Sequence, residues 1–276
     1  MLFTCLRCYG INFSWYYKRK SMFNMQKFHK IFLFICLLSS FVITSCDNSG
    51  NVIEQKKKTL VMGTTADYPP FEFIKDKKIR GFDIDLAYAI AKKLGYSIYI
   101  KDMNFDSLIP ALQTQRIDFA MSGFTRTPKR EKQIDFSAPY YIPTFAMVYN
   151  KDNPITTVES LKNKTIATQL GTTMEVFLKE KEKSTESLKI ISLTRIPAMI
   201  QELKLKRFDG VLVEGAQARV FANKHKELEY ALFTNTGEGY SVAFPKGSVL
   251  TEQFNDVIVK LRDSGELDEL KNKWFF

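Results

Sequence analysis

The sequence predicts an α/β protein with two lobes, and two observations support this fold class. Across residues 59–276, short apolar runs typical of strands alternate with apolar residues spaced as on amphipathic helices. Two β-rich segments, Thr144–Asn150 and Gly239–Pro245, interrupt this alternation. If both cross between lobes, the first lobe is discontinuous, the second is continuous, and a cleft lies between them.

The individual elements follow from apolar spacing and from residues that start or stop a helix. Helical spacing at i, i+3, i+4 and i+7 begins at Ile84 and again at Ile196. Asp83 is expected to cap the first of these helices and Gly95 to end it. Two helices close the chain, with a break at Gly265. The predicted strands are Leu60–Thr64, Ser97–Ile100, Ile117–Met121, Thr165–Ala167, Lys189–Leu193 and Gly210–Val213.

The amino-terminal 46 residues predict an export signal. Lysines precede an apolar run of 13 residues, Ile31 to Ile43, which is too short for an ordinary membrane-spanning helix but typical of a signal peptide. The tetrad Ile43-Thr44-Ser45-Cys46 resembles a bacterial lipobox, in which the cysteine becomes the lipid-carrying amino terminus. A signal without lipid is the alternative. Residues 1–24 look like an upstream extension, and Met25 is the better start.

Composition excludes several classes of function. All four cysteines lie within the first 46 residues, and the only histidines are His29 and His225, which excludes a Cys/His zinc cluster or a two-histidine mechanism in the folded part. The net charge of +10 includes six bases and no acid before residue 47, so +10 − 6 = +4 remains. Lysine and glutamate are interspersed in the rest of the chain and do not form a basic cluster, so we expect no nucleic-acid partner. No phosphate-binding or dinucleotide motif occurs, so we expect no cofactor and no metal.

Several ordered motifs resemble the polar-amino-acid-binding proteins of bacterial ABC importers, the extracellular solute-binding family 3. The resemblance covers residues 59–276 and implies a type II periplasmic-binding-protein fold. With the crossings above, the first lobe spans 59–148 and 244–276, the second spans 149–243, and 47–58 is a linker. The motifs are GTTADYPPFE (63–72), GFDIDL (81–86), SGFTRTPKR (122–130), IDFSAPY (134–140), QLGTT (169–173) and FDGVLVE (208–214).

The resemblance also assigns residues to the carboxylate end of an amino acid. Arg130 stands where the family's arginine takes the α-carboxylate, and a planar guanidinium offers two parallel charge-assisted bonds. Gly123 and Thr125 match positions that hold the same group, Gly123 through its main chain only. Thr172 and Thr173, at a predicted helix start, offer free N–H groups to the anion. The alternatives are a surface pair of Arg130 with Glu131 or Asp135, and simple capping by Thr172.

The remaining assignments concern the ammonium and the side chain of the ligand. Glu214 occupies the acidic position that pairs with the α-ammonium; aspartate is commoner there, so its contact stays open, and a surface carboxylate is the alternative. Tyr68 and Phe105 match aromatic walls, or are core residues. Glu72 and Gln169 are candidates for a cationic or amide end group. Thr65 replaces an aspartate of some basic-amino-acid binders; we favour arginine or another basic ligand, then glutamine.

These features predict an extracytoplasmic, monomeric substrate-binding subunit that closes about a hinge and delivers an amino acid to permease subunits. Lipid on Cys46 would hold it at a membrane, with the inner membrane favoured. An enzyme on the same scaffold, similar to cyclohexadienyl dehydratases with Glu214 or Glu238 as general acid, is the competing hypothesis. A ligand-sensing ectodomain is a third, but no later apolar run of 18 residues occurs.

Overall fold

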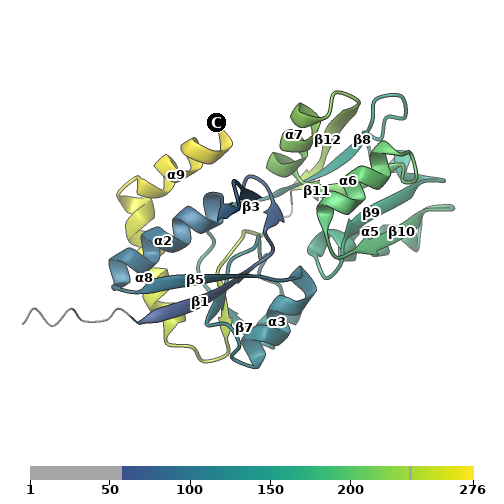
Figure 1. The fold of residues 1–276 in the computed structure, drawn as a ribbon. Helices are drawn as coiled ribbons and strands as arrows, with labels where there is room; N and C mark the ends of the chain where they lie inside the picture. The colour runs from purple at the N-terminus through teal and green to yellow at the C-terminus, as the bar shows by residue number, and fades with distance from the viewer. Residues whose placement is uncertain (1–57, 236–237) are drawn as a thin grey trace, which may run out of the picture. The chain divides into compact units, whose positions relative to one another are not determined.

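The computed structural model describes residues 58–235 and 238–276. The predicted signal peptide, Cys46 and all of the linker except Lys58 lie outside these residues. The described part contains two five-stranded sheets and one small sheet, each covered or flanked by helices (Figure 1). Within this part, no helix is long and apolar enough to cross a membrane.

The first sheet draws its strands from both ends of the described chain. Its second strand, β1, runs parallel to β5 and β6, with Thr59 opposite Ser97 and Met62 opposite Phe119. The strand β13 is antiparallel and lies between β6 and β7. In spatial order the strands are β5 (Ser97–Asp102), β1 (Thr59–Thr64), β6 (Phe119–Ala120), β13 (Ala243–Pro245) and β7 (Ile134–Phe136).

The second sheet is built from one continuous stretch of chain. Strand β9 is parallel to β10 and β11, whereas β8 is antiparallel to β11 and β12. All of β8 pairs within this sheet, so the chain has already crossed when it reaches Thr144; the predicted lobe boundary at 149 would divide this strand. In spatial order the strands are β10 (Lys189–Leu193), β9 (Thr165–Gln169), β11 (Gly210–Glu214), β8 (Thr144–Asn150) and β12 (Leu228–Asn235).

Both faces of the second sheet are buried, as its apolar strands require. On β8, Phe145 and Met147 join one core cluster, whereas Ala146 and Val148 join another. Because successive residues of a strand point to opposite faces, helix α5 packs on one face and α6 and α7 on the other. These helices are α5 (Thr173–Glu182), α6 (Ile196–Lys204) and α7 (Gly215–Lys224).

The first sheet is covered in the same way. Helices α2, α8 and α9 contact one another beside β1 and β5, and α3 packs against β1, β6, β7 and β13 from the other side (Figure 1). Gly95 ends α2 in the left-handed conformation, which confirms that expectation. The helices are α2 (Phe82–Leu94), α3 (Phe105–Gln113), α4 (Pro128–Glu131), α8 (Leu250–Asp263) and α9 (Glu266–Phe275), with a 3₁₀ turn η2 at Glu159–Leu161.

The prediction that Asp83 caps α2 is wrong. Gly81 is the residue at the cap, with φ 138°, and a Cβ there would lie 2.0 Å from the carbonyl oxygen of Phe71. Asp83 lies inside the first turn, and its side chain turns into the core instead. The sequence also gave no sign of the small antiparallel sheet next to α2, whose strands are β2 (Asp67–Tyr68), β3 (Glu72–Lys75) and β4 (Lys78–Arg80).

The two segments that connect the sheets run beside each other. The amide of Tyr240 donates to the carbonyl of Tyr141 at 2.7 Å, and the amide of Tyr140 donates to the carbonyl of Tyr240 at 2.8 Å. Tyr240 also bridges to Thr125 of the first lobe. The second β-rich segment is therefore extended from Tyr240 onward, although only Ala243–Pro245 forms a strand. These paired connections confirm two α/β lobes joined by two crossings.

Candidate ligand-binding site

Arg130 is held in place by a short helix. The side chain of Thr127 accepts from the Arg130 amide at 3.3 Å, and Pro128 at the first helical position suits a helix start. Only 7% of Arg130 is exposed, which is rare for arginine unless it is paired. The local sequence therefore fixes a guanidinium in the interior.

Arg130 has polar and aromatic neighbours but no anionic one. Its Nη1 donates to the carbonyl of Thr125 at 2.7 Å, and its Nη2 donates to the carbonyl of Gly171 at 3.0 Å. The guanidinium carbon lies 5.4 Å and 5.1 Å from the ring centres of Phe105 and Phe124. Burial lowers its pKa to about 10. A buried cation of this kind favours an incoming anion.

The alternative of a surface ion pair for Arg130 is excluded. Among the residues described, no carboxylate lies within ion-pair distance of its guanidinium. Glu131 pairs instead with Arg126, and Asp135 pairs with Lys246 at 2.7 Å.

The start of α5 faces the same site. Thr172 is its N-cap, because its hydroxyl accepts from the Glu175 amide at 3.2 Å and donates to the Gln169 carbonyl at 2.7 Å. The amides of Thr173 and Met174 occupy the first two helical positions, where no intrahelical acceptor exists. Capping by Thr172 and attraction of an anion by this end of the helix are thus compatible.

Residues of both lobes enclose a small cavity around Arg130. Its volume is about 10 Å³, enough for roughly one water molecule. Seven of the ten predicted ligand-binding residues line it, and they are Arg130, Gly123, Thr172, Thr173, Tyr68, Phe105 and Gln169. Ser122, Met174 and Tyr240 complete the wall.

Gly123 forms a tight part of this wall. Its φ of +59° is left-handed, and an added Cβ would lie 3.1 Å from the ring of Tyr240. Its amide donates to Asp83 at 3.3 Å. The sequence predicted a main-chain contact of Gly123 with the ligand, and only the carbonyl is available to make it.

Glu214 does not share the cavity with Arg130, contrary to the expectation of a joint clamp. Its side chain folds back to cap its own helix, accepting from the amides of Ala216 at 2.7 Å and Gln217 at 3.2 Å. Its other oxygen accepts from the hydroxyl of Tyr141 at 3.0 Å. Glutamate is long enough to make this turn, and burial raises its pKa. It lines a separate cavity of about 380 Å³ with Arg219.

Two other predicted residues also stay behind the cavity wall. Thr125 contributes its carbonyl to Arg130 without lining the cavity. Glu72 is fully buried and accepts from the hydroxyl of Ser122 at 2.6 Å. Burial and the charge of Asp83 raise the pKa of Glu72 well above its usual range. Glu72 therefore supports Ser122 and does not line the cavity.

Three of the residues that line the cavity were not predicted from the sequence. Ser122 directly precedes Gly123, so its motif position was a usable signal. Tyr240 lies in the second β-rich segment, and its hydroxyl lies 3.0 Å from that of Tyr68. No sequence feature pointed to Met174, except that it directly follows Thr173. Within residues 58–235 and 238–276, no group of three or more histidine, cysteine, aspartate or glutamate side chains is placed to hold a metal.

Comparison with known sequences identifies the family of this chain. The sequence model of the bacterial extracellular solute-binding proteins, family 3, matches residues 60–276. The arginine-binding extracellular protein ArtP of Bacillus subtilis is 40% identical over 91% of this chain and 98% of its own length. A probable histidine-binding protein of Campylobacter jejuni is 32% identical over 91% of this chain and 99% of its own.

Solved structures give the same result. An ancestral arginine-binding protein bound to arginine is 39% identical, with a TM-score of 0.75 over 80% of this chain and 99% of its own. An ancestral arginine-binding protein bound to glutamine also has a TM-score of 0.75 and 39% identity, over 79% of this chain and 98% of its own. These relatives are solute-binding proteins, not enzymes, which removes the dehydratase hypothesis. The chain belongs to the bacterial extracellular solute-binding proteins, family 3, and has their type II periplasmic-binding-protein fold.

Proposed function

We propose that this protein is the extracytoplasmic, monomeric binding subunit of an ABC importer and takes a free L-amino acid, with arginine favoured over glutamine. The observation that carries the proposal is the buried guanidinium of Arg130, which lacks an anionic partner in the described chain and faces the free amides at the start of α5. An α-carboxylate supplies the missing charge and accepts from both sides.

The ligand side chain would lie between Tyr68, Phe105 and Gln169. Flat rings suit an aliphatic stem or a guanidinium plane, and an amide suits either arginine or glutamine. The relatives and neighbours named for arginine support the first choice, and the structure bound to glutamine supports the second.

Glu214 remains the candidate partner of the α-ammonium. Burial raises the pKa of Tyr68 and Tyr240, which both line the cavity, and the charge of Glu214 adds to this rise. To reach the ligand it must exchange its bond with Tyr141 for one with the ammonium. The neutral variant Glu214→Gln should therefore weaken binding of amino acids and leave binding of a carboxylate-only analogue much less affected.

The size of the site supports the proposed closure about a hinge. A cavity of about 10 Å³ does not admit an amino acid, and in the proposed cycle the lobes separate for entry. The paired connections at Tyr141 and Tyr240 are the natural place for this rotation. Contacts to α5 then form only on closing, which gives the ligand the differential affinity that shifts the population.

The proposal also includes a lipid anchor and permease subunits. Lipid on Cys46 would keep the protein beside its permease, and the linker at 47–58 would let it reach the channel. Cys46→Ser should release the protein from membranes and abolish incorporation of labelled fatty acid. Retention of the variant in the membrane fraction would contradict the anchor.

Calorimetric titration of the full protein with each of the twenty amino acids tests the central proposal. We expect one or a few ligands, led by arginine, and loss of binding in Arg130→Ala with the thermal unfolding transition retained. Absence of binding to all twenty would contradict the proposal. The matched control is Arg126→Ala, because Arg126 lies in the same segment but is exposed and paired with Glu131.

A further inference from the structure

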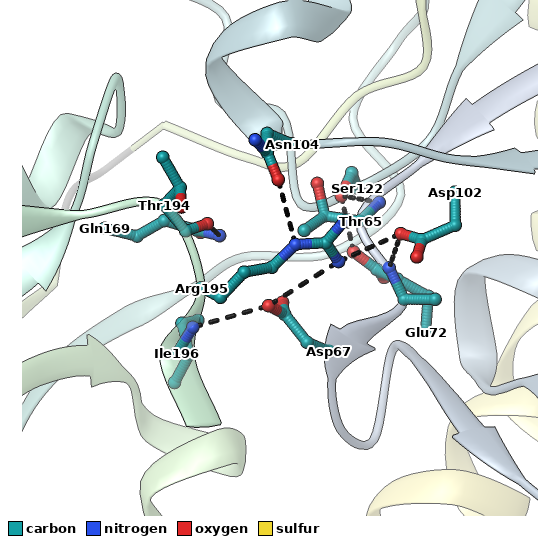
Figure 2. A network of polar contacts seen from close by, with 11 residues as sticks. Thr65, Asp67, Glu72, Asp102, Asn104, Ser122, Gln169, Thr194, Arg195 and Ile196 are labelled. Atoms are coloured by element: carbon teal, nitrogen blue, oxygen red, sulfur yellow. Dashed lines mark hydrogen bonds and ion pairs between the residues drawn. The ribbon is translucent and has the colours of Figure 1, made fainter. Parts of the chain in front are cut away.

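Arg195 connects the two lobes beside the cavity. It is the residue before α6 in the second lobe, and its Nε donates to Asn104 Oδ1 at 2.9 Å. Its Nη1 donates to Asp102 Oδ1 at 3.0 Å. Figure 2 shows this guanidinium between Asn104 on one side and Asp67 and Asp102 on the other, all three from the first lobe.

A second contact joins the same two places. Asp67 Oδ2 accepts from the amide of Ile196 at 3.3 Å and lies 3.8 Å from Arg195 Nη1. Ile196 is the first residue of α6, so its amide has no acceptor inside the helix. The beginning of α6 is thus held by the first lobe through both a side chain and the main chain.

One of the acceptors, Asp102, is also bonded within its own lobe. Asp102 Oδ1 also accepts from the amide of Ala66 at 2.9 Å, a contact within the first lobe. Burial raises the pKa of Asp67 to about 6, although Arg195 opposes this rise. Burying Asp67 therefore offsets part of what the ion pair contributes, and the contact favours closure moderately without locking it.

None of these residues lines the cavity of Arg130. We propose that Arg195 is a positioning residue: with Asp102, Asn104 and Asp67 it forms a latch between the lobes that stabilises the closed arrangement without contacting the ligand. This inference rests on the proposed function, in which an amino acid is held between the lobes.

A latch of this kind predicts slower release for every ligand by the same factor. Arg195 and Asp102 side chains are each about one-third exposed, and such pairs shift an equilibrium by roughly fivefold at most. Arg195→Ala should therefore raise the dissociation rates of arginine and glutamine alike, by about fivefold, and leave the association rates within about twofold. A changed ratio between the two ligands would instead make Arg195 a contact residue and overturn the latch.

Hydrogen exchange of the full protein without ligand tests the latch independently of binding. In Arg195→Ala, the amides at the start of α6 should exchange faster, because Ile196 loses the neighbouring lobe. Arg195→Lys should retain part of the protection that Arg195→Ala loses. Its single ammonium can reach Asp102 but cannot donate in one plane to both Asp102 and Asn104. Lys162→Ala is the matched control, because its exposed pair with Glu186 stays inside the second lobe.

Asp102→Asn provides the second variant, because an amide oxygen retains the bond from the Ala66 amide while removing the charge. Combined with Arg195→Ala, it should add little, since both remove one interaction. Unchanged exchange at α6 in all these variants would overturn the latch. If the wild type binds no amino acid, the proposed function fails, and the exchange measurement still decides whether the latch exists.

Discussion

Arg130 shows how one residue defines the chemistry of the cavity. Its guanidinium is buried and bonded to two carbonyls, which supply partial negative charge but no counterion. Lysine in its place has a single ammonium and cannot donate in parallel to a carboxylate while keeping both carbonyls.

Arg130→Lys should accordingly weaken amino-acid binding at least about 30-fold, which corresponds to roughly 2 kcal/mol. Isothermal titration measures this loss, and circular dichroism checks that the fold is retained. The exposed Arg126→Lys should change affinity by no more than about twofold. Equal losses in the two variants would mean that general charge, and not the buried geometry, governs binding.

The buried carboxyls of Asp83 and Glu72 make the free energy of unfolding depend on pH. Burial raises the pKa of Asp83 to about 6 from an ordinary value near 3.8. A carboxyl whose folded pKa is raised stabilises the fold fully below its unfolded pKa and loses that contribution as pH rises through 6. At neutral pH the pair therefore lowers the free energy of unfolding.

Asp83→Asn should remove this term. The amide oxygen can still accept from Tyr140 and Gly123, and the amide nitrogen can donate to the Glu72 oxygen that lacks another partner in the described structure. We expect the free energy of unfolding at pH 7.5 to rise by about 1–2 kcal/mol and its change between pH 4 and 6 to shrink. Urea titrations across pH measure both, and a variant less stable than wild type at pH 7.5 would contradict this account.

At the level of single residues, the sequence predicted positions better than contacts. Seven assigned residues line the cavity because their motif positions fix them on the ends of strands and helices. Glu214 is at the predicted end of β11, but the path of its longer side chain depends on Tyr141 and on the free amides of α7. Which of the available donors a carboxylate meets is decided by packing, which no local sequence pattern encodes.

Helix α5 is the element on which the carboxylate site depends. Its cap by Thr172 fixes where the free amides begin, and Glu175 Oε2 accepts from the amide of Gly171 at 2.7 Å just before it. Thr172→Ala should lower the free energy of unfolding by about 1 kcal/mol and weaken binding several-fold. Thr172→Ser should retain both. If serine is as damaging as alanine in thermal unfolding and titration, the methyl group matters and the cap does not.

Among the elements, long periodic segments were predictable and short ones were not. Strand Lys189–Leu193 and the helices at Ile84 and Ile196 agree with the structure, and both helices have an apolar face at helical spacing. Strand β2 has only two residues, too few for any alternation to appear, and pairs with β3 in a local hairpin. Strand β6 lies within the predicted Ile117–Met121 but covers only Phe119–Ala120, where it pairs with β1 and β13, both distant in sequence.

For the whole molecule, a ligand bound between the lobes should stabilise both. At a ligand concentration one hundred times the dissociation constant, the gain is about 2.7 kcal/mol. Thermal unfolding with arginine should show one upward-shifted transition. At the same arginine concentration the gain should fall to about 0.9 kcal/mol or less in Arg130→Lys, because binding is at least about 30-fold weaker. A shift confined to one of two separate transitions would mean that the ligand contacts a single lobe.

The position of β13 has a consequence for how the chain matures. Within residues 58–235 and 238–276, strand β7 pairs only with β13, and β13 arrives more than a hundred residues later, after the whole second sheet. A chain synthesised amino terminus first can therefore assemble its later lobe while the earlier one still has an open edge. The addition of residues 243–245 is the event that allows the first sheet to close, so truncations before that point should be preferred targets of proteolysis.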